Sequence, residues 1–242
     1  MTVEFIEIDS GILRGNVLSI QDFDPDSDFE AFERSYIAEY DPVYVSCKIP
    51  MEHVNDTHAL ENAGFRLIEF QIKSAVKLRK PFDVSAFPYD FERVTREDDL
   101  GAVLDIAGGA FRHDRFYVDR SLDAGVSGAR FREYVRQSFD SPDEAVYRLV
   151  DRSSGNTVAF KTHRYVAKDE VLFLLGGVHP DFKDLGLGPI NEYFEFNELM
   201  RKGIKRGTTH ISAANYAVFN LEIGSFGFRV LTSFAVLRKV YH

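Results

Sequence analysis

The chain has 242 residues, 45% of them hydrophobic, which is enough for one large domain or for a full domain with a smaller partner. A formal net charge of -9 argues against a nucleic acid or an anionic membrane as partner, because both bind basic surfaces. The single cysteine, Cys47, excludes an intrachain disulfide, and no apolar run has the length of a membrane span. We therefore expect a cytoplasmic protein with a buried Cys47 thiol.

Residues 1–80 are expected to form a small N-terminal α/β unit. Strand patterns cover residues 3–8, 12–20, 44–49 and 66–78, and helical patterns cover residues 28–39 and 52–63. Prolines among basic and aromatic residues mark residues 81–90 as a linker. The acidic run 22–28 mimics a calcium loop, but Ser27 replaces the turn glycine, so we predict no metal site.

Residues 91–242 are expected to form a second, larger unit. Helical patterns cover residues 96–111, 128–139, 189–202 and 218–224, and strand patterns cover residues 146–151, 157–166, 171–177, 208–214 and 228–241. Gly155-Asn156 separates the first two of these strands and predicts a hairpin. This alternation predicts an α/β (α+β) fold with strands of both directions.

The segment Val178–Gly188 reads Val-His-Pro-Asp-Phe-Lys-Asp-Leu-Gly-Leu-Gly and joins an apolar strand to an amphipathic helix. The first-turn N–H groups of a helix have no intrahelical partner, and their dipoles attract anions. Glycines there let a phosphate approach the backbone. The order strand, glycine loop, helix therefore predicts a pyrophosphate site.

One stretch of the N-terminal unit is echoed near the end of the chain. Residues 60–70 end a helix and continue through Gly-Phe-Arg into a strand, and residues 221–231 do the same with two extra residues. A helix that stops at glycine is common, so the echo has a purely local explanation. The alternative is a duplication, with residues 1–80 as a degenerate half-copy that lacks the glycine loop and is structural.

The larger unit resembles the GNAT superfamily of acyl-CoA-dependent N-acyltransferases over about residues 91–242. The resemblance rests on Val178-x-Pro180, a basic residue, Gly186-x-Gly188, a helix, a strand, and Asn215 followed by Gly227-Phe228. It implies the GNAT fold, a mixed and mostly antiparallel sheet flanked by helices, with the N-terminal unit as a smaller partial GNAT-like domain. Lys183 stands where the family usually has Gln or Arg, and Pro189 removes one first-turn N–H from the cradle.

The resemblance also implies a cosubstrate, acetyl-CoA or another short acyl-CoA. The residues that it implies for binding this cosubstrate are Gly177, Val178, Lys183, Asp184, Leu185, Gly186, Leu187, Gly188, Asn215 and Asn220. In the family the pantetheine arm lies along the strand before the loop, and the thioester meets a backbone N–H at a bulge. Gly176-Gly177 suits that bulge, and we expect Val178 N–H among the donors. The alternative is that these glycines only bend the strand.

Within that superfamily the chain looks most like the dTDP-fucosamine acetyltransferase group. The segment Ala110–Asp119, the helix that follows it and the small N-terminal unit carry this narrower resemblance. It implies acylation of the amine of a nucleotide-linked deoxy-amino sugar. The implied substrate contacts are His113, Arg115, Tyr117 and His179, with Arg115 pairing a phosphate. The aromatic residues of this region also suit a core.

Acyl transfer to an amine requires a base and a proton for the leaving thiolate. Family members place a Tyr on the last short helix, where this chain has Glu222 and Ile223. Glu222 serves as the acid only if burial raises its pKa, Tyr216 only if the helix begins early, and the thiolate could also leave unassisted. For the base, His163 and His179 are candidates, because histidine titrates near neutral pH; a chain of waters is the alternative.

Two further functions stay open on the sequence alone. The acceptor could be a peptide, a polyamine or a small metabolite, or the chain could bind acyl-CoA without catalysis because the family's Tyr is missing. We expect no nucleic-acid or membrane partner. The oligomeric state is open, and a homodimer is one of the options.

Overall fold

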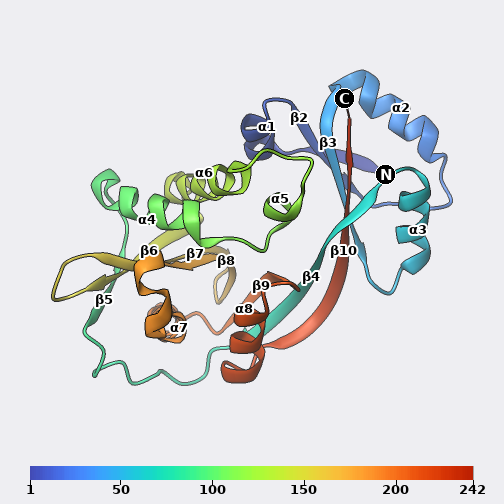
Figure 1. Ribbon diagram of the computed structural model, residues 1–242. Coiled ribbons are helices and arrows are strands. Elements are labelled where there is room, and N and C mark those ends of the chain that lie inside the picture. Colours follow the sequence, from blue (N-terminus) through green and yellow to red (C-terminus); the bar gives the residue numbers. More distant parts are fainter. Residues whose placement is uncertain (242) are drawn as a thin grey trace.

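The computed structural model describes residues 1–241, except for the side chain of Asp184, and contains one continuous ten-stranded sheet (Figure 1). The strands follow the order β1-β2-β3-β10-β4-β9-β8-β7-β6-β5. The pairs β2/β3 and β8/β9 are parallel, and the other seven neighbouring pairs are antiparallel. This confirms the predicted mixed, mostly antiparallel sheet flanked by helices.

The elements of the N-terminal third alternate in type. They are β1 (Thr2–Phe5), α1 (Glu7–Leu13), β2 (Asn16–Gln21), α2 (Phe29–Tyr40), β3 (Pro42–Pro50), α3 (Val54–Asn62) and β4 (Arg66–Lys77). The middle of the chain forms β5 (Tyr89–Arg93), α4 (Glu97–Ala110), α5 (Arg115–Val118), α6 (Val126–Asp140), β6 (Glu144–Asp151), β7 (Thr157–Ala167) and β8 (Glu170–Val178). The chain then forms a 3₁₀ helix (Pro180–Leu185), α7 (Leu187–Arg201), β9 (Arg206–Ser212), α8 (Tyr216–Asn220), a π-helical turn (Leu221–Ser225) and β10 (Arg229–Val240).

The two halves of the chain repeat one pattern. In each, a parallel strand pair is connected by a helix, α2 between β2 and β3 and α7 between β8 and β9, and a second helix leads to a long final strand. Gly64 and Gly227 both have positive φ, 91° and 69°, and each is followed by a buried Phe, Phe65 or Phe228. This correspondence supports the duplication interpretation, although the division at residues 81–90 stays a prediction.

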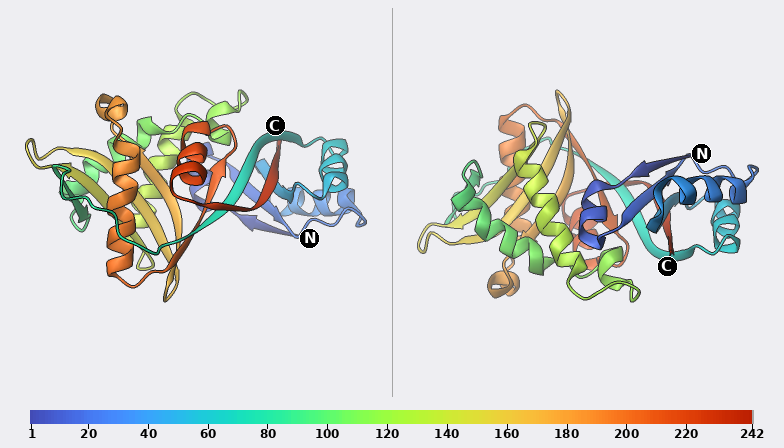
Figure 2. Two further views of the ribbon diagram at one scale, coloured as in Figure 1. Left: turned by 90° about the horizontal axis from the view of Figure 1, so that it is seen from below. Right: turned by 90° about the horizontal axis from the view of Figure 1, so that it is seen from above.

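The long final strands of the two halves are exchanged. β10 lies between β3 and β4, and β4 pairs with β9, so each half completes its sheet with the other's last strand. Both views in Figure 2 show β10 running to the helices of the N-terminal third, where it contacts α3. The two halves therefore share one sheet.

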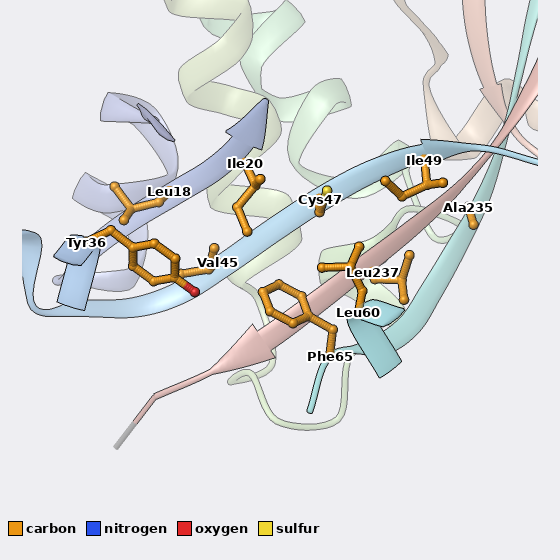
Figure 3. Packing of buried hydrophobic residues seen from close by; sticks show 10 residues of the cluster. All are labelled: Leu18, Ile20, Tyr36, Val45, Cys47, Ile49, Leu60, Phe65, Ala235 and Leu237. Atoms are coloured by element: carbon orange, nitrogen blue, oxygen red, sulfur yellow. The ribbon is translucent and has the colours of Figure 1, made fainter. Parts of the chain in front are cut away.

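The N-terminal core lies between α2, α3 and one face of β2, β3 and β10 (Figure 3). Its buried members are Leu18, Ile20, Tyr36, Val45, Cys47, Ile49, Leu60, Phe65, Ala235 and Leu237. Cys47 is 2% exposed, and burial raises the pKa of its thiol to about 12. This confirms the predicted buried thiol, which is unreactive because the thiolate is the nucleophile.

Two helical layers cover the C-terminal half of the sheet. α4 and α6 pack on one face of β6 and β7 through a core that includes Ile106, Phe131 and Phe160. α7 packs on the opposite face through Leu187, next to Leu149. Because strand side chains alternate between faces, β7 sends Phe160 to one layer and its neighbours Ala159 and Lys161 to the other.

The structure corrects three sequence-based boundaries. Residues 7–13 form helix α1 where strands were predicted at 3–8 and 12–20, because Ile6 and Leu13 pack against the Tyr44–Phe116 cluster. Tyr89–Arg93, which overlaps the predicted linker, forms the edge strand β5 against β6. A short helix, α5, interrupts the predicted substrate segment. In each case tertiary contacts override the local pattern.

Candidate functional site

The two parallel strands at the centre of the C-terminal half pair only at their beginnings. Glu170–Leu172 of β8 align with Arg206–Thr208 of β9, and beyond these three pairs the strands diverge, although β8 continues to Val178 and β9 to Ser212. In the N-terminal half the corresponding strands β2 and β3 stay paired over five positions. Of the two parallel pairs, β8/β9 therefore opens a gap in the sheet and β2/β3 does not.

A cavity of about 500 Å³ occupies this gap. Its lining includes Glu192 and Glu195 from α7 on one face of the sheet and Arg130 and Phe131 from α6 on the other. β4 of the N-terminal half adds Glu69. The cavity therefore passes through the sheet and draws its walls from both halves of the chain.

The open edge of β8 carries backbone groups without a strand partner on that side. His179 N–H donates to Val158 on β7 at 2.8 Å, so the alternation of the strand directs the N–H groups of Val178 and Gly176 toward the gap. The predicted bulge lies elsewhere: Gly176 and Gly177 pair regularly with β7, and the register shift falls at Leu174, between Phe173 and Leu175. The expected location of the bulge at Gly176-Gly177 was wrong by two residues.

The glycine loop leads from β8 to α7 at the mouth of the cavity. Gly186 has a left-handed φ of 69° and precedes Leu187, the first residue of α7, so the helix begins two residues earlier than predicted. Gly186, at the N-cap, has no side chain with which to cap the N–H groups of the first turn. Lys183 and Gly188 both line the cavity. First-turn N–H groups, glycine and a lysine together suit a phosphate.

Glu222 lies in the π-helical turn after α8 and lines the cavity. Such turns are rare and frequently occur at functional sites. The side chain is 7% exposed and accepts a hydrogen bond from Ser74 Oγ on β4 at 3.5 Å. Burial, reinforced by the charge of Glu192, raises the pKa of Glu222 to about 8. Glu222 therefore carries a proton at neutral pH, which is the condition set for it as an acid.

A buried charged cluster lies beside Glu222, between β7 and α7. Lys161 forms an ion pair with Glu192, and its Nζ lies 3.5 Å from Glu195 Oε2. Burial alone would lower the pKa of Lys161, but the two carboxylates outweigh it and raise that pKa. Burial raises the pKa of Glu192. Helices that cover sheets normally present apolar side chains, so this cluster is unusual.

His163, predicted as a base, lies behind this cluster. The ring is 0% exposed; Nδ1 lies 3.0 Å from Glu195 Oε1, and Nε2 lies 3.1 Å from Tyr165 Oη. His163 therefore contacts the cavity only through Glu195, which lines it.

The opposite side of the cavity carries both signs of charge. Arg115 lines it with its side chain 20% exposed, and the Nε of Arg115 is buried with no hydrogen-bond partner among the residues that the structure describes. Burial raises the pKa of Glu69, against the opposing charge of Arg115. The carboxylate of Asp9 in α1 accepts a hydrogen bond from Arg130 Nε at 2.6 Å and lies 3.8 Å from Arg115 Nη2. This wall suits a ligand with an amine and an anionic group.

The structure brings together about half of the predicted site residues. Those that line the cavity are Glu222, Gly177, Val178, Lys183, Gly188, Asn215, His113 and Arg115. Those that the cavity lining does not include are His163, Tyr216, Leu185, Gly186, Leu187, Asn220, Tyr117 and His179. The side chain of Asp184 lies outside the described part of the structure.

Specific contacts explain several of these placements. Tyr216 is 72% exposed and Tyr117 is 54% exposed, so both point to solvent. α8 begins at Tyr216, two residues earlier than predicted, but this early start does not turn the Tyr216 side chain inward. Leu187 is fully buried in the core. His179 accepts a hydrogen bond from Asp181 N–H, and Asn215 caps α8 by accepting one from Val218 N–H.

Sequence reasoning missed several ionisable residues of the cavity wall, among them Lys161, Glu192, Glu195, Glu69 and His210. Acidic residues on an amphipathic helix ordinarily face solvent, so no local signal distinguishes Glu192 and Glu195. Partial burial and neighbouring lysines lower the pKa of His210 to about 4, so its imidazole is neutral at neutral pH.

Comparison with solved structures identifies the fold. A GCN5-related N-acetyltransferase from Sphaerobacter thermophilus superposes with a TM-score of 0.68 and 14% identity, covering 98% of this chain and 76% of the other. A tandem GNAT protein from the clavulanic acid biosynthesis pathway superposes with a TM-score of 0.63 and 12% identity, covering 93% of this chain and 75% of the other. A GCN5-related N-acetyltransferase from Kribbella flavida superposes with a TM-score of 0.61 and 14% identity, covering 94% of this chain and 82% of the other. The chain therefore has the GNAT fold.

Comparisons at the level of sequence are silent. No protein-family model matches the chain, and no curated protein matches it. Among the described residues, no helix combines the length and apolar character that crossing a membrane requires.

Proposed function

We propose that the protein is an acyl-CoA-dependent N-acyltransferase. The observation that carries this proposal is the gap between β8 and β9, which holds a cavity and ends at the glycine loop. An extended ligand arm fits along the open edge of β8, where the backbone groups after Leu172 pair with no strand among the described residues and can bond to the ligand. The fold shared with N-acetyltransferases supports the same conclusion.

The cosubstrate is acetyl-CoA or another short acyl-CoA. Its pyrophosphate lies against the first turn of α7, with Lys183 as the basic partner and Gly188 allowing close approach. The thioester lies at the β8 edge, where Val178 N–H donates to the oxyanion that develops on the carbonyl. The other proposed contacts in this region are Gly177, Asp184, Leu185, Gly186, Leu187, Asn215 and Asn220.

Glu222 is the general acid in this proposal. The acceptor nitrogen attacks the thioester carbonyl, the C–S bond breaks, and the neutral carboxyl of Glu222 gives its proton to the leaving sulfur. Its pKa of about 8 supports this role, because an acid must be protonated at the working pH. Tyr216, 72% exposed, and His163, fully buried, have less support.

The proposed acceptor is the amine of a nucleotide-linked, dTDP-type, deoxy-amino sugar. Arg115 supplies a guanidinium to a phosphate of the acceptor, with His113 beside it on the cavity wall, and Glu69 offers a carboxyl group for an amine or sugar hydroxyl. A peptide, polyamine or small metabolite is the competing acceptor class. A non-catalytic acyl-CoA-binding protein is the competing function, since the family's usual Tyr is missing.

The test is to incubate the protein with acetyl-CoA and a panel of dTDP- and UDP-amino sugars, polyamines and peptides, and to follow free thiol. Turnover with a dTDP-amino sugar is expected. Turnover only with a peptide or polyamine would refute the sugar acceptor while keeping the enzyme class. Binding of CoA without thiol release from any amine would favour the non-catalytic function.

A further inference from the structure

Two buried carboxyl groups, those of Glu192 and Glu195, flank one buried ammonium beside the cavity, and the buried Glu222 carboxyl group lies within the reach of their charges. Glu192, Glu195 and Glu222 are 8%, 0% and 7% exposed, and the side chain of Lys161 is 12% exposed. Even a positively charged His163 leaves the carboxylates with one negative charge in excess. Burying an uncompensated charge costs more than protonating it, so one carboxyl group retains a proton.

The contacts indicate which group retains it. Glu192 is paired with Lys161, and Glu195 lies 3.5 Å from the same ammonium and 3.0 Å from His163. The carboxyl group of Glu222 accepts one hydrogen bond among the described residues, from the neutral hydroxyl of Ser74. The resting proton therefore belongs on Glu222, and Glu192 is the ionised carboxylate whose charge acts most strongly on it.

The ammonium of Lys161, which pairs with Glu192, lies over the face of β8 at Gly176. A Cβ placed on Gly176 would lie 2.9 Å from Lys161 Cδ and 3.0 Å from its Nζ, so the missing side chain of Gly176 makes room for the ammonium. The N–H of Gly176 faces the gap by the same alternation that directs Val178. Glu192 is thus held beside the place where a thioester along β8 would be attacked.

We propose that Glu192 is the general base of the acyl transfer and that Glu192 and Glu222 share a single proton through each turnover. This inference rests on the proposed function. A neutral amine attacks the thioester carbon; the N–C bond forms and the C–S bond breaks. The amine proton passes to the Glu192 carboxylate, and the Glu222 proton passes to sulfur.

The cycle closes inside the cluster. After the transfer, Glu192 holds a proton and Glu222 is a carboxylate, so the proton moves from Glu192 to Glu222 and restores the resting state. No proton is gained from or lost to solvent when the amine enters neutral. Lys161 favours the ionised form of Glu192, while Glu195 and His163 are positioning residues that hold Lys161 in place.

The kinetic test compares Glu192→Gln, Glu192→Asp and Glu198→Gln. Glu198 lies on the same helix but bonds Arg201 near the surface, so Glu198→Gln is the matched control. We expect Glu192→Gln to lower kcat about 100-fold or more and to remove the acidic limb of its pH profile. Glu192→Asp, which keeps the charge but retracts it, should recover part of kcat. Unchanged kcat and acidic limb in Glu192→Gln would overturn the base assignment.

A second readout does not depend on turnover. Infrared difference spectra across pH follow the C=O stretch of a neutral buried carboxyl group, which Glu222→Gln should abolish. In Glu192→Gln that band should disappear at lower pH than in wild type, because the neighbouring negative charge is gone. An unshifted band would overturn the shared proton. Because the band reports the carboxyl group directly, it decides this even in a variant that has lost activity.

The two arms separate this inference from the proposed function. Wild type that turns over an amine, together with an unaffected Glu192→Gln, refutes the base while the acyltransferase stands. Wild type that binds CoA and acylates no amine refutes the acyltransferase and the base together, even where the infrared band shifts as expected.

Discussion

Ser74 Oγ lies 3.5 Å from Glu222 Oε2, and this contact joins β4 of the N-terminal half to the π-helical turn of the C-terminal half. The exchange of β4 and β10 makes the contact possible, because it places β4 next to β9 at the edge of the gap. The N-terminal half therefore contributes to the cavity, with Ser74 against the acid and Glu69 on the acceptor wall.

The pH dependence of kcat should report the proton on Glu222. Its pKa is raised to about 8, and the proposed acid is active only when protonated, so activity should fall as the pH rises through about 8. Glu222→Gln should lower kcat about 100-fold and remove this alkaline limb. Ser74→Ala removes a bond that favours the ionised carboxyl, so the limb should move to higher pH. An alkaline limb that persists in Glu222→Gln would eliminate Glu222 as the acid.

Packing at Gly177 predicts a loss of stability on adding one methyl group. A Cβ there would lie 2.7 Å from Phe160 and 3.1 Å from Ala110. Gly177→Ala should therefore lower the free energy of unfolding by about 1–3 kcal/mol in urea titrations. Gly101, in α4 with no atom within 4 Å of the added carbon, is the control, and Gly101→Ala should raise stability by about 0.5–1 kcal/mol. Equal effects of the two variants would contradict the packing argument.

Binding of CoA should depend on Lys183. Removing one phosphate contact with Lys183→Ala should raise the Kd for CoA about fivefold to tenfold, measured by titration calorimetry at low salt. The effect should shrink as salt is added, because exposed charges are screened. Lys168→Ala, in the turn between β7 and β8, serves as control and should leave Kd unchanged. The same Kd in wild type and Lys183→Ala would remove Lys183 from the phosphate site.

Arg115 should act on the acceptor alone. Arg115→Ala should raise the KM for a sugar nucleotide about tenfold or more and leave the KM for acyl-CoA unchanged, because a bond to a charged group is lost on one side of the cavity. Arg120→Ala, an exposed arginine five residues on, is the control. A change in the KM for acyl-CoA instead would place Arg115 on the cosubstrate side.

Local patterns were sufficient for the glycine loop and its neighbours. The apolar run of β8, the turn at Gly186 and the amphipathic α7 are each encoded within a few residues, and the structure has them in the predicted order. Glu222 was predictable as a candidate because its position follows from the spacing to Asn215. Its burial was not, because the π-helical turn and Ser74 belong to the tertiary structure.

The remaining features depend on long-range pairing. Nothing local to Arg229–Val240 specifies that β10 enters between β3 and β4. The cluster of Lys161 and Glu192 joins residues 31 positions apart, and each alone is typical of an exposed surface. Such pairs become visible only when β7 and α7 are packed together.

The central claim is that this cavity transfers an acyl group to an amine, and stoichiometry tests it most directly. Acetyl-CoA, the protein and a dTDP-amino sugar are mixed, and thiol released and amide formed are both quantified, the second by mass spectrometry. We expect equal amounts of thiol and amide, both lowered about 100-fold in Glu222→Gln. Thiol release without amide, or CoA binding with neither product for any amine, would contradict it.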